Sequence, residues 1–226
     1  MPDAPDLLWD DPEHPLPSGA VLVLAHGAGA PMDAADMTRT ARALADAGLR
    51  VARFEFGYMA ARRGGTRKPP PRAETLVGEY RAAVAAVGAS TGAGTPLLIG
   101  GRSMGGRVAT LVLDELWREG VAAGGAVISY PWHPPGKPEQ PRIAHLEHLS
   151  APLLVCQGTR DPFGSPEDVA GYPLSASVRV EWFDDGDHSL VPRKTVSGHT
   201  AAEHLARAAA LIAAFATSLG AEPGGG

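Results

Sequence analysis

Short apolar runs alternate with amphipathic segments along most of the chain. Six runs have the length and composition of buried strands: residues 21–25, 49–56, 96–100, 126–130, 153–157 and 178–183. Four longer segments repeat apolar residues every three to four positions, as helices do: residues 34–47, 73–87, 104–119 and 199–219. Strands that are apolar throughout and separated by helices indicate a mostly parallel sheet covered on both faces. The pattern therefore predicts an α/β fold of three layers.

Length and composition fit one compact domain. The chain has 226 residues, of which 44% are apolar and 20% charged, and this suffices for one sizeable core. We expect a single domain over residues 20–219, an irregular proline-rich lead-in over residues 1–19 and a flexible tail over residues 220–226.

Several features favour a cytoplasmic protein that binds neither membranes nor nucleic acids. No run approaches the roughly 18–20 apolar residues of a membrane-spanning helix, and the acidic, proline-rich start is unlike a signal peptide. The net charge of −5 gives no general attraction to nucleic acid. The single cysteine, Cys156, excludes an internal disulfide and fits a reducing compartment.

A G-x-S-x-G motif, formed by Gly101, Ser103 and Gly105, lies between a predicted strand and a predicted helix. A serine on such a sharp turn has strained backbone angles, and the positions two before and two after it must be small. The turn lifts the hydroxyl clear of the sheet and directs the N–H of Met104 toward a developing oxyanion. The motif predicts Ser103 as a nucleophile.

A nucleophilic serine needs a histidine base and an acid that orients it. Asp161 follows the predicted strand 153–157, and His188 follows the strand 178–183. Serine, then acid, then histidine is the chain order that accompanies a nucleophile turn of this kind. Four other carboxylates compete for the role of the acid: Asp168, Asp184, Asp185 and Asp187. Asp161 is better placed than these, at a strand end.

The loop His26-Gly-Ala-Gly-Ala30 follows the first predicted strand. Its glycines allow backbone amides to turn inward, so we expect the N–H of Ala28 to be the second oxyanion donor and His26 to brace the loop. Together with Glu55, the loop also resembles half of a dinucleotide-binding unit. Met32 stands where the third glycine would be, which disfavours that alternative.

Positive charge gathers in residues 57–72, which we expect to form a loop. The basic residues there are Arg62, Arg63, Arg67, Lys68 and Arg72. A solvated loop is the favoured interpretation. A loop overhanging Ser103, with Arg102 beside it, would instead attract an anionic substrate.

Only 22 residues, rich in proline, separate the strands 126–130 and 153–157, too few for a lid domain. We therefore expect an open pocket, and its candidate substrate-binding residues are Arg102, Tyr58, Trp132, His133 and Phe163. His145 and His148 could share a helix face and bind a metal, but no third ligand has fitting spacing. We expect no metal and no other cofactor.

The motifs around Ser103, Asp161 and His188, with Tyr130-Pro-Trp-His-Pro-Pro-Gly-Lys-Pro138, resemble the α/β-hydrolase superfamily. More narrowly, they are similar to the dienelactone-hydrolase-like group that includes the testis-expressed and NSL-complex-subunit hydrolase-like proteins. The resemblance covers about residues 20–215 and implies the triad and the oxyanion hole named above. Dienelactone hydrolases proper use a cysteine nucleophile, so the serine argues against that substrate.

The sequence thus predicts a minimal, lidless α/β-hydrolase fold and a carboxylesterase-like serine hydrolase. Its substrates would be small carboxylic esters, with thioesters and amides as further classes, cleaved through an acyl-enzyme. The alternative is an interaction or scaffold protein that keeps the fold without relevant turnover.

Overall fold

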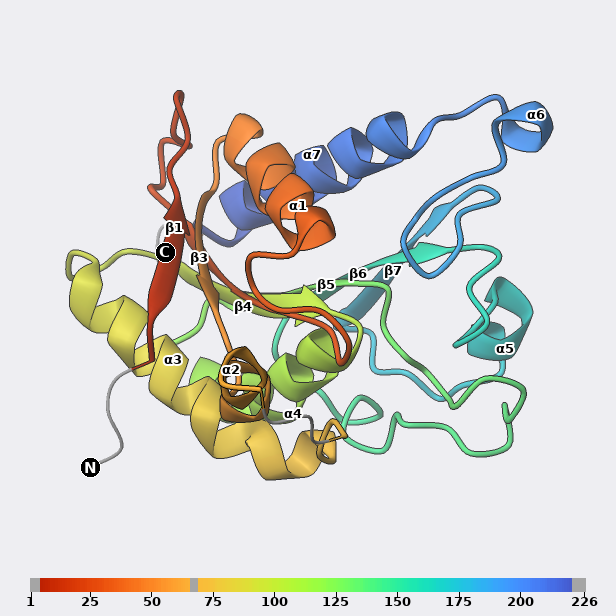
Figure 1. The fold of residues 1–226 in the computed structure, drawn as a ribbon, viewed down its shortest axis with the longest axis horizontal. Coiled ribbons are helices and arrows are strands. Elements are labelled where there is room, and N and C mark those ends of the chain that lie inside the picture. Colours follow the sequence, from red (N-terminus) through yellow and green to blue (C-terminus); the bar gives the residue numbers. More distant parts are fainter. Residues whose placement is uncertain (1–4, 66–68, 221–226) are drawn as a thin grey trace, which may run out of the picture.

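The computed structural model describes residues 5–65 and 69–220, and a seven-stranded sheet forms their centre (Figure 1). Its strands are β1 (Leu7–Asp10), β2 (Val21–Ala25), β3 (Arg50–Phe54), β4 (Leu97–Arg102), β5 (Gly124–Ile128), β6 (Leu153–Gly158) and β7 (Val178–Phe183). They are arranged in the order β1-β3-β2-β4-β5-β6-β7. All neighbouring strands are parallel except β1, which runs antiparallel to β3.

Helices cover both faces of this sheet. The helical elements are α1 (Ala35–Asp46), α2 (Gly57–Arg63), the 3-10 turn η1 (Ala73–Leu76), α3 (Val77–Ser90), α4 (Met104–Arg118), α5 (Pro166–Ala170), α6 (Lys194–Ser197) and α7 (Ala201–Gly220). Alternate side chains of a strand point to opposite faces. Val21 and Val23 therefore share a core with α3 and α4, and Leu22 and Leu24 share the other core with α1 and α7. Figure 1 shows these two pairs of helices on opposite sides of the sheet. The three-layer α/β prediction is confirmed.

Strand β1 lies inside the segment that we expected to be irregular. Its Leu-Leu-Trp run is too short to give a strand signal, but the backbone pairs with β3 at the edge of the sheet. Side chains hold it there, because the Arg50 guanidinium lies 4.1 Å from the Trp9 ring centroid and Arg53 donates two hydrogen bonds to Asp10. The expectation of an irregular lead-in is corrected for these four residues.

The basic segment also differs from the expected loop, because residues 57–63 form helix α2. This stretch contains no proline and is rich in Ala, Met and Arg, which favour helix. Arg63 forms ion pairs with Asp33 and Glu55, so it contributes little free charge. Arg67 and Lys68 lie outside the described residues.

The crossover between β5 and β6, residues 129–152, contains turns but no helix or strand. It leaves the carboxyl end of β5 and returns to the start of the parallel strand β6 without forming a lid domain, as the sequence predicted. None of the helices in the described part of the chain is long and apolar enough to cross a bilayer. Cys156 is fully buried in β6, and burial raises the pKa of its thiol to about 12.

Tyr80 of α3 fastens this helix to the middle of the sheet. Its buried hydroxyl accepts a hydrogen bond from Gly100 N at 2.7 Å and lies 2.7 Å from Gly100 O and 3.1 Å from Val23 O. The residue thus satisfies backbone groups of β2 and β4 just before the chain reaches Ser103. The helical periodicity of α3 predicts that Tyr80 faces the core, but it does not predict the hydrogen bonds of its hydroxyl with the sheet.

We expect Tyr80→Phe to lower the free energy of unfolding by about 1–3 kcal/mol, because Gly100 N–H would be buried without an acceptor. Urea denaturation measures this change. Tyr172→Phe is the matched control, since its hydroxyl contacts Pro138 O at the exposed surface and its loss should cost far less. Equal effects of the two substitutions would contradict the assignment.

Candidate active site

Ser103 occupies the turn between β4 and α4 with φ of 50°, in the left-handed region that non-glycine residues rarely adopt. The neighbouring glycines explain how the turn holds this shape. A Cβ atom on Gly105 would lie 2.4 Å from His26 O, and one on Gly101 would lie 2.6 Å from Ala25 O. The turn therefore packs directly on the backbone at the end of β2, and only glycine fits at either position.

The structure brings Ser103, His188 and Asp161 into one hydrogen-bonded chain. His188 Nε2 lies 2.8 Å from Ser103 Oγ, and His188 Nδ1 lies 2.7 Å from Asp161 Oδ2. Because a carboxylate only accepts hydrogen bonds, Nδ1 carries the proton and Nε2 is free to accept from the serine hydroxyl. The three residues come from loops after β4, β6 and β7, at one end of the sheet.

Asp161 is held rigidly beneath the histidine. It is 2% exposed and accepts hydrogen bonds from Gln157 Nε2 at 2.8 Å and from Phe163 N at 2.9 Å. These donors replace the water that a buried carboxylate loses. Gln157, at the end of β6, was not singled out from the sequence, because a glutamine in an otherwise apolar strand has no motif of its own.

The four competing carboxylates have other partners or lie apart from the histidine. Asp168 forms the capping box of α5 with Ser165, Asp187 accepts from backbone amides of its own turn, and Asp184 is exposed. Asp185 binds Arg193 and Arg160. Hydrogen bonds from the Arg193 side chain hold the pKa of Asp185 well below its usual range, so this pair ties the two ends of the His188 loop together.

The loop after β2 lies against the nucleophile turn. His26 is fully buried, accepts a hydrogen bond from Phe56 N at 3.1 Å through Nε2, and donates from Nδ1 to Gly27 O at 2.7 Å. Tyr58 donates its hydroxyl to Ala28 O at 3.1 Å. His26 therefore braces the loop, and Tyr58, expected to contact substrate, supports the loop as well.

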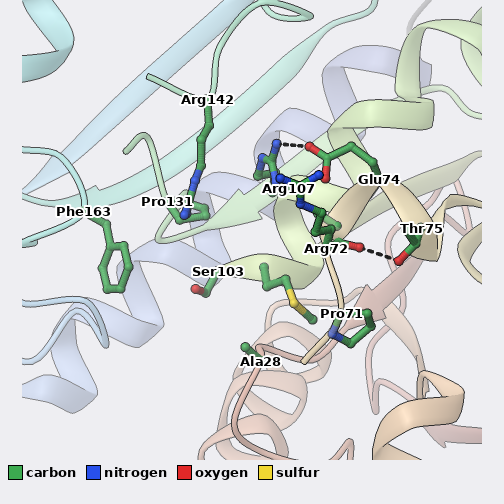
Figure 2. A pocket seen from close by; sticks show the side chains of 12 residues that line it. Ala28, Pro71, Arg72, Glu74, Thr75, Ser103, Arg107, Pro131, Arg142 and Phe163 are labelled. Carbon is green, nitrogen blue, oxygen red and sulfur yellow. Dashed lines mark hydrogen bonds and ion pairs between the residues drawn. The ribbon is translucent and has the colours of Figure 1, made fainter. Parts of the chain in front are cut away.

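The site opens into a cleft of about 790 Å³ (Figure 2). The residues that line it are Ala28, Pro71, Arg72, Ala73, Glu74, Thr75, Ser103, Met104, Arg107, Pro131, Arg142 and Phe163. Both predicted oxyanion residues, Ala28 and Met104, thus border the same space as Ser103. The Phe163 ring packs on the His188 imidazole, with 4.3 Å between ring centroids.

Three residues expected at the pocket lie elsewhere. Trp132 is fully buried against Tyr130 and fills the space beside Gly164. His133 is also buried, between Pro134 O and the Asp168 carboxylate. Arg102 points to the opposite face of the sheet, toward Asp36 and Thr40 of α1. Each of the three side chains packs against other parts of the fold, and none of them lines the cleft.

The contacts of Glu55 and His145 do not support a dinucleotide site or a metal site. Glu55, which a dinucleotide site would need for the ribose, binds Arg63 and Met32 N. His145 Nε2 lies 2.9 Å from Thr110 Oγ1, and burial lowers its pKa to about 4. Within residues 5–65 and 69–220, no three His, Cys, Asp or Glu side chains gather in a way that could hold a metal ion.

Gly105→Ala should lower the free energy of unfolding by about 1–3 kcal/mol or more, because the new Cβ overlaps the His26 carbonyl oxygen. Gly78→Ala is the matched control, since a Cβ there meets nothing within 4 Å in helix α3 and alanine favours helix. Chemical denaturation compares the two. A Gly105→Ala protein as stable as Gly78→Ala would contradict the close packing of the turn.

His26 should make stability depend on pH. Burial lowers its pKa below the ordinary 6.5. Just below pH 6.5 the imidazole is therefore protonated in the unfolded chain and still neutral in the folded chain. The free energy of unfolding is therefore insensitive to His26 above about pH 6.5 and falls as the pH drops below it, by at most about 1.4 kcal/mol per pH unit. His26→Gln should flatten this acid-side slope, measured by urea denaturation between pH 7.5 and 5. The exposed His148 serves as control, and an unchanged slope in His26→Gln would overturn the assignment.

Comparisons with known proteins agree with this architecture. A family model described as an alpha/beta hydrolase domain matches residues 18–217. A search among curated proteins found no match. Among solved structures, an alpha-beta serine hydrolase homologue from Coxiella burnetii has a TM-score of 0.68 at 18% identity, over 91% of this chain and 90% of that chain.

Two further structures share the fold at similarly low identity. A dienelactone hydrolase from Anabaena variabilis has a TM-score of 0.67 at 19% identity, over 94% of this chain and 90% of that chain. A serine hydrolase described as lacking a lid, from Xanthomonas campestris, has a TM-score of 0.57 at 21% identity, over 84% of this chain and 88% of that chain. With the family match spanning nearly the whole described sheet, the chain belongs to the α/β-hydrolase family.

Proposed function

We propose that this protein is a serine hydrolase that cleaves carboxylic esters, with thioesters and amides as further substrate classes. The observation that carries the proposal is the hydrogen-bonded chain from Ser103 Oγ through His188 to Asp161, with distances of 2.8 Å and 2.7 Å. A scaffold protein would not need a strained serine, a histidine and a buried carboxylate in this alignment.

The reaction runs in two steps. Ser103 Oγ forms a bond to the acyl carbon while His188 Nε2 accepts the serine proton and passes it to the departing alkoxide, so that an alcohol leaves. Water then attacks the acyl-enzyme, His188 accepts a proton from it, and Ser103 regains its hydrogen as the carboxylic acid leaves. Asp161 stabilises the imidazolium that forms in each step.

Negative charge develops on the carbonyl oxygen in both steps. The N–H groups of Met104 and Ala28 are the proposed donors, because both residues border the cleft at Ser103. Each donor of this kind contributes about 3–4 kcal/mol to lowering the barrier. The Tyr58 hydroxyl bound to Ala28 O supports the loop that presents one of them.

The cleft is bounded by the crossover of residues 129–152 and by η1, with no lid domain over it. Such a site suits small substrates or exposed groups on larger ones. The narrower resemblance to the testis-expressed and NSL-complex-subunit group and the cytoplasmic location remain predictions from the sequence.

Fluorophosphonate labelling and turnover of p-nitrophenyl acetate test the proposal. The folded wild-type protein should be labelled at Ser103 and hydrolyse the ester, and Ser103→Ala should abolish labelling and lower kcat by about 10⁴-fold or more. Asp161→Asn should lower kcat by about 10⁴-fold, because His188 would adopt the wrong tautomer.

Ser189→Ala is the matched control, because Ser189 is an exposed serine next to His188 and does not line the cleft. This variant should keep labelling and turnover close to wild type. A folded wild-type protein that is neither labelled nor active, or a Ser103→Ala protein that is labelled as well as wild type, would exclude Ser103 as the nucleophile.

A further inference from the structure

The cleft around Ser103 carries an excess of positive charge. Its lining includes three guanidinium groups, from Arg72, Arg107 and Arg142, and one carboxylate, from Glu74. Figure 2 shows the side chains of Arg107 and Arg142 on the same side of the cleft, facing the space above Ser103. The whole chain has a net charge of −5, so this local excess is opposite in sign to the rest of the protein.

Arg142 is held in place by its backbone, while its guanidinium forms no ion pair with any residue that the structure describes. Its N–H donates to Trp132 O at 2.7 Å, and its carbonyl accepts from the Tyr130 hydroxyl at 2.7 Å. The neighbouring carboxylate of Glu74 pairs with Arg107 instead. Burial, and after it the positive charge of Arg107, lowers the pKa of Arg142. An anion bound at this point would offset both effects.

Arg107 lies one helical turn beyond Ser103 on α4, so both side chains share one face of the helix. Glu74 of η1 forms an ion pair with one end of its guanidinium. Its Nε is buried and has no hydrogen-bond partner within the described part of the chain. Glu74 therefore orients Arg107 without neutralising the cleft, because Arg72 and Arg142 remain.

Arg142 differs in this from Arg63, Arg118 and Arg193, each of which forms an ion pair with a neighbouring carboxylate. Guanidinium groups that keep free N–H donors inside a cleft match planar anions such as carboxylates, which they bind through two parallel hydrogen bonds. A positively lined cleft also raises the local concentration of anionic ligands.

We infer that the cleft takes esters that carry a free carboxylate, which Arg142 and Arg107 bind while the ester carbonyl meets Ser103. This inference rests on the proposed ester hydrolysis and names its substrate class: monoesters of short dicarboxylic acids. The carboxylate takes no part in bond making, and the products are the dicarboxylic acid and the alcohol. Of the three arginines that line the cleft, only Arg72 belongs to the basic segment 57–72, and Arg107 and Arg142 lie outside it.

A matched pair of substrates tests the inference. Mono-p-nitrophenyl glutarate and p-nitrophenyl valerate have the same acyl length, and only the first carries a carboxylate. Wild type should prefer the glutarate ester, and the preference should fall as salt is raised. Arg142→Gln and Arg107→Gln should each lower kcat/KM for the glutarate ester about tenfold more than for the valerate ester.

Arg118→Gln is the matched control, since Arg118 lies on the same helix as Arg107 but outside the cleft and pairs with Asp114. It should leave the ratio of the two kcat/KM values unchanged. A wild-type ratio that does not depend on salt, or an equal ratio in wild type and Arg142→Gln, would overturn the inference while leaving ester hydrolysis intact.

Calorimetry separates this result from a failure of the proposed function. Glutarate should bind Ser103→Ala protein, which needs no turnover, and binding should weaken about tenfold when Arg142→Gln is added. If wild type hydrolyses neither ester, the proposed function fails. The titration then shows by itself whether Arg142 and Arg107 form a site that binds a carboxylate. Binding that is absent, or unchanged by Arg142→Gln, overturns the site.

Discussion

The turn between β4 and α4 packs so closely on the end of β2 that neither Gly101 nor Gly105 has room for a Cβ atom. This contact forces Ser103 into a positive φ and turns its hydroxyl toward the carboxyl end of the sheet. It also presses the loop that contains Ala28 against the start of α4. The positions of the proposed nucleophile and of the proposed oxyanion donors therefore follow from one packing constraint, between the end of β2 and the turn from β4 to α4.

The loops around this contact are fixed by carboxylates with specific partners. Asp161 is held by a strand-end glutamine and a backbone amide, and Asp185 links the two ends of the histidine loop through Arg193. Glu55 joins the end of β3 to α2 through Arg63. Irregular segments have no backbone ladder, so such charge-assisted hydrogen bonds take over the task of defining their conformation. The cleft differs, because there the cations outnumber the anions.

Local sequence patterns predicted the strand, turn and helix around Ser103, and the order of strands placed Asp161 and His188 at the same edge. The orientation of Arg102 follows from the same strand, because successive strand side chains alternate between faces and the residue before Ser103 therefore points away from the cleft. Trp132 and Arg142 had no such signal. Both lie in an irregular crossover, where the direction of a side chain depends on tertiary packing and has no period.

The buried thiol of Cys156 has a practical consequence. Its side chain lies in the core between the sheet and the helices α1 and α7, so no reagent reaches the sulfur while these helices stay packed on the sheet. Modification of this single thiol then requires the helical layer to open, and the rate of modification reports how often that happens. The protein thus contains a natural, site-specific probe of the opening of this layer, which needs no engineered label.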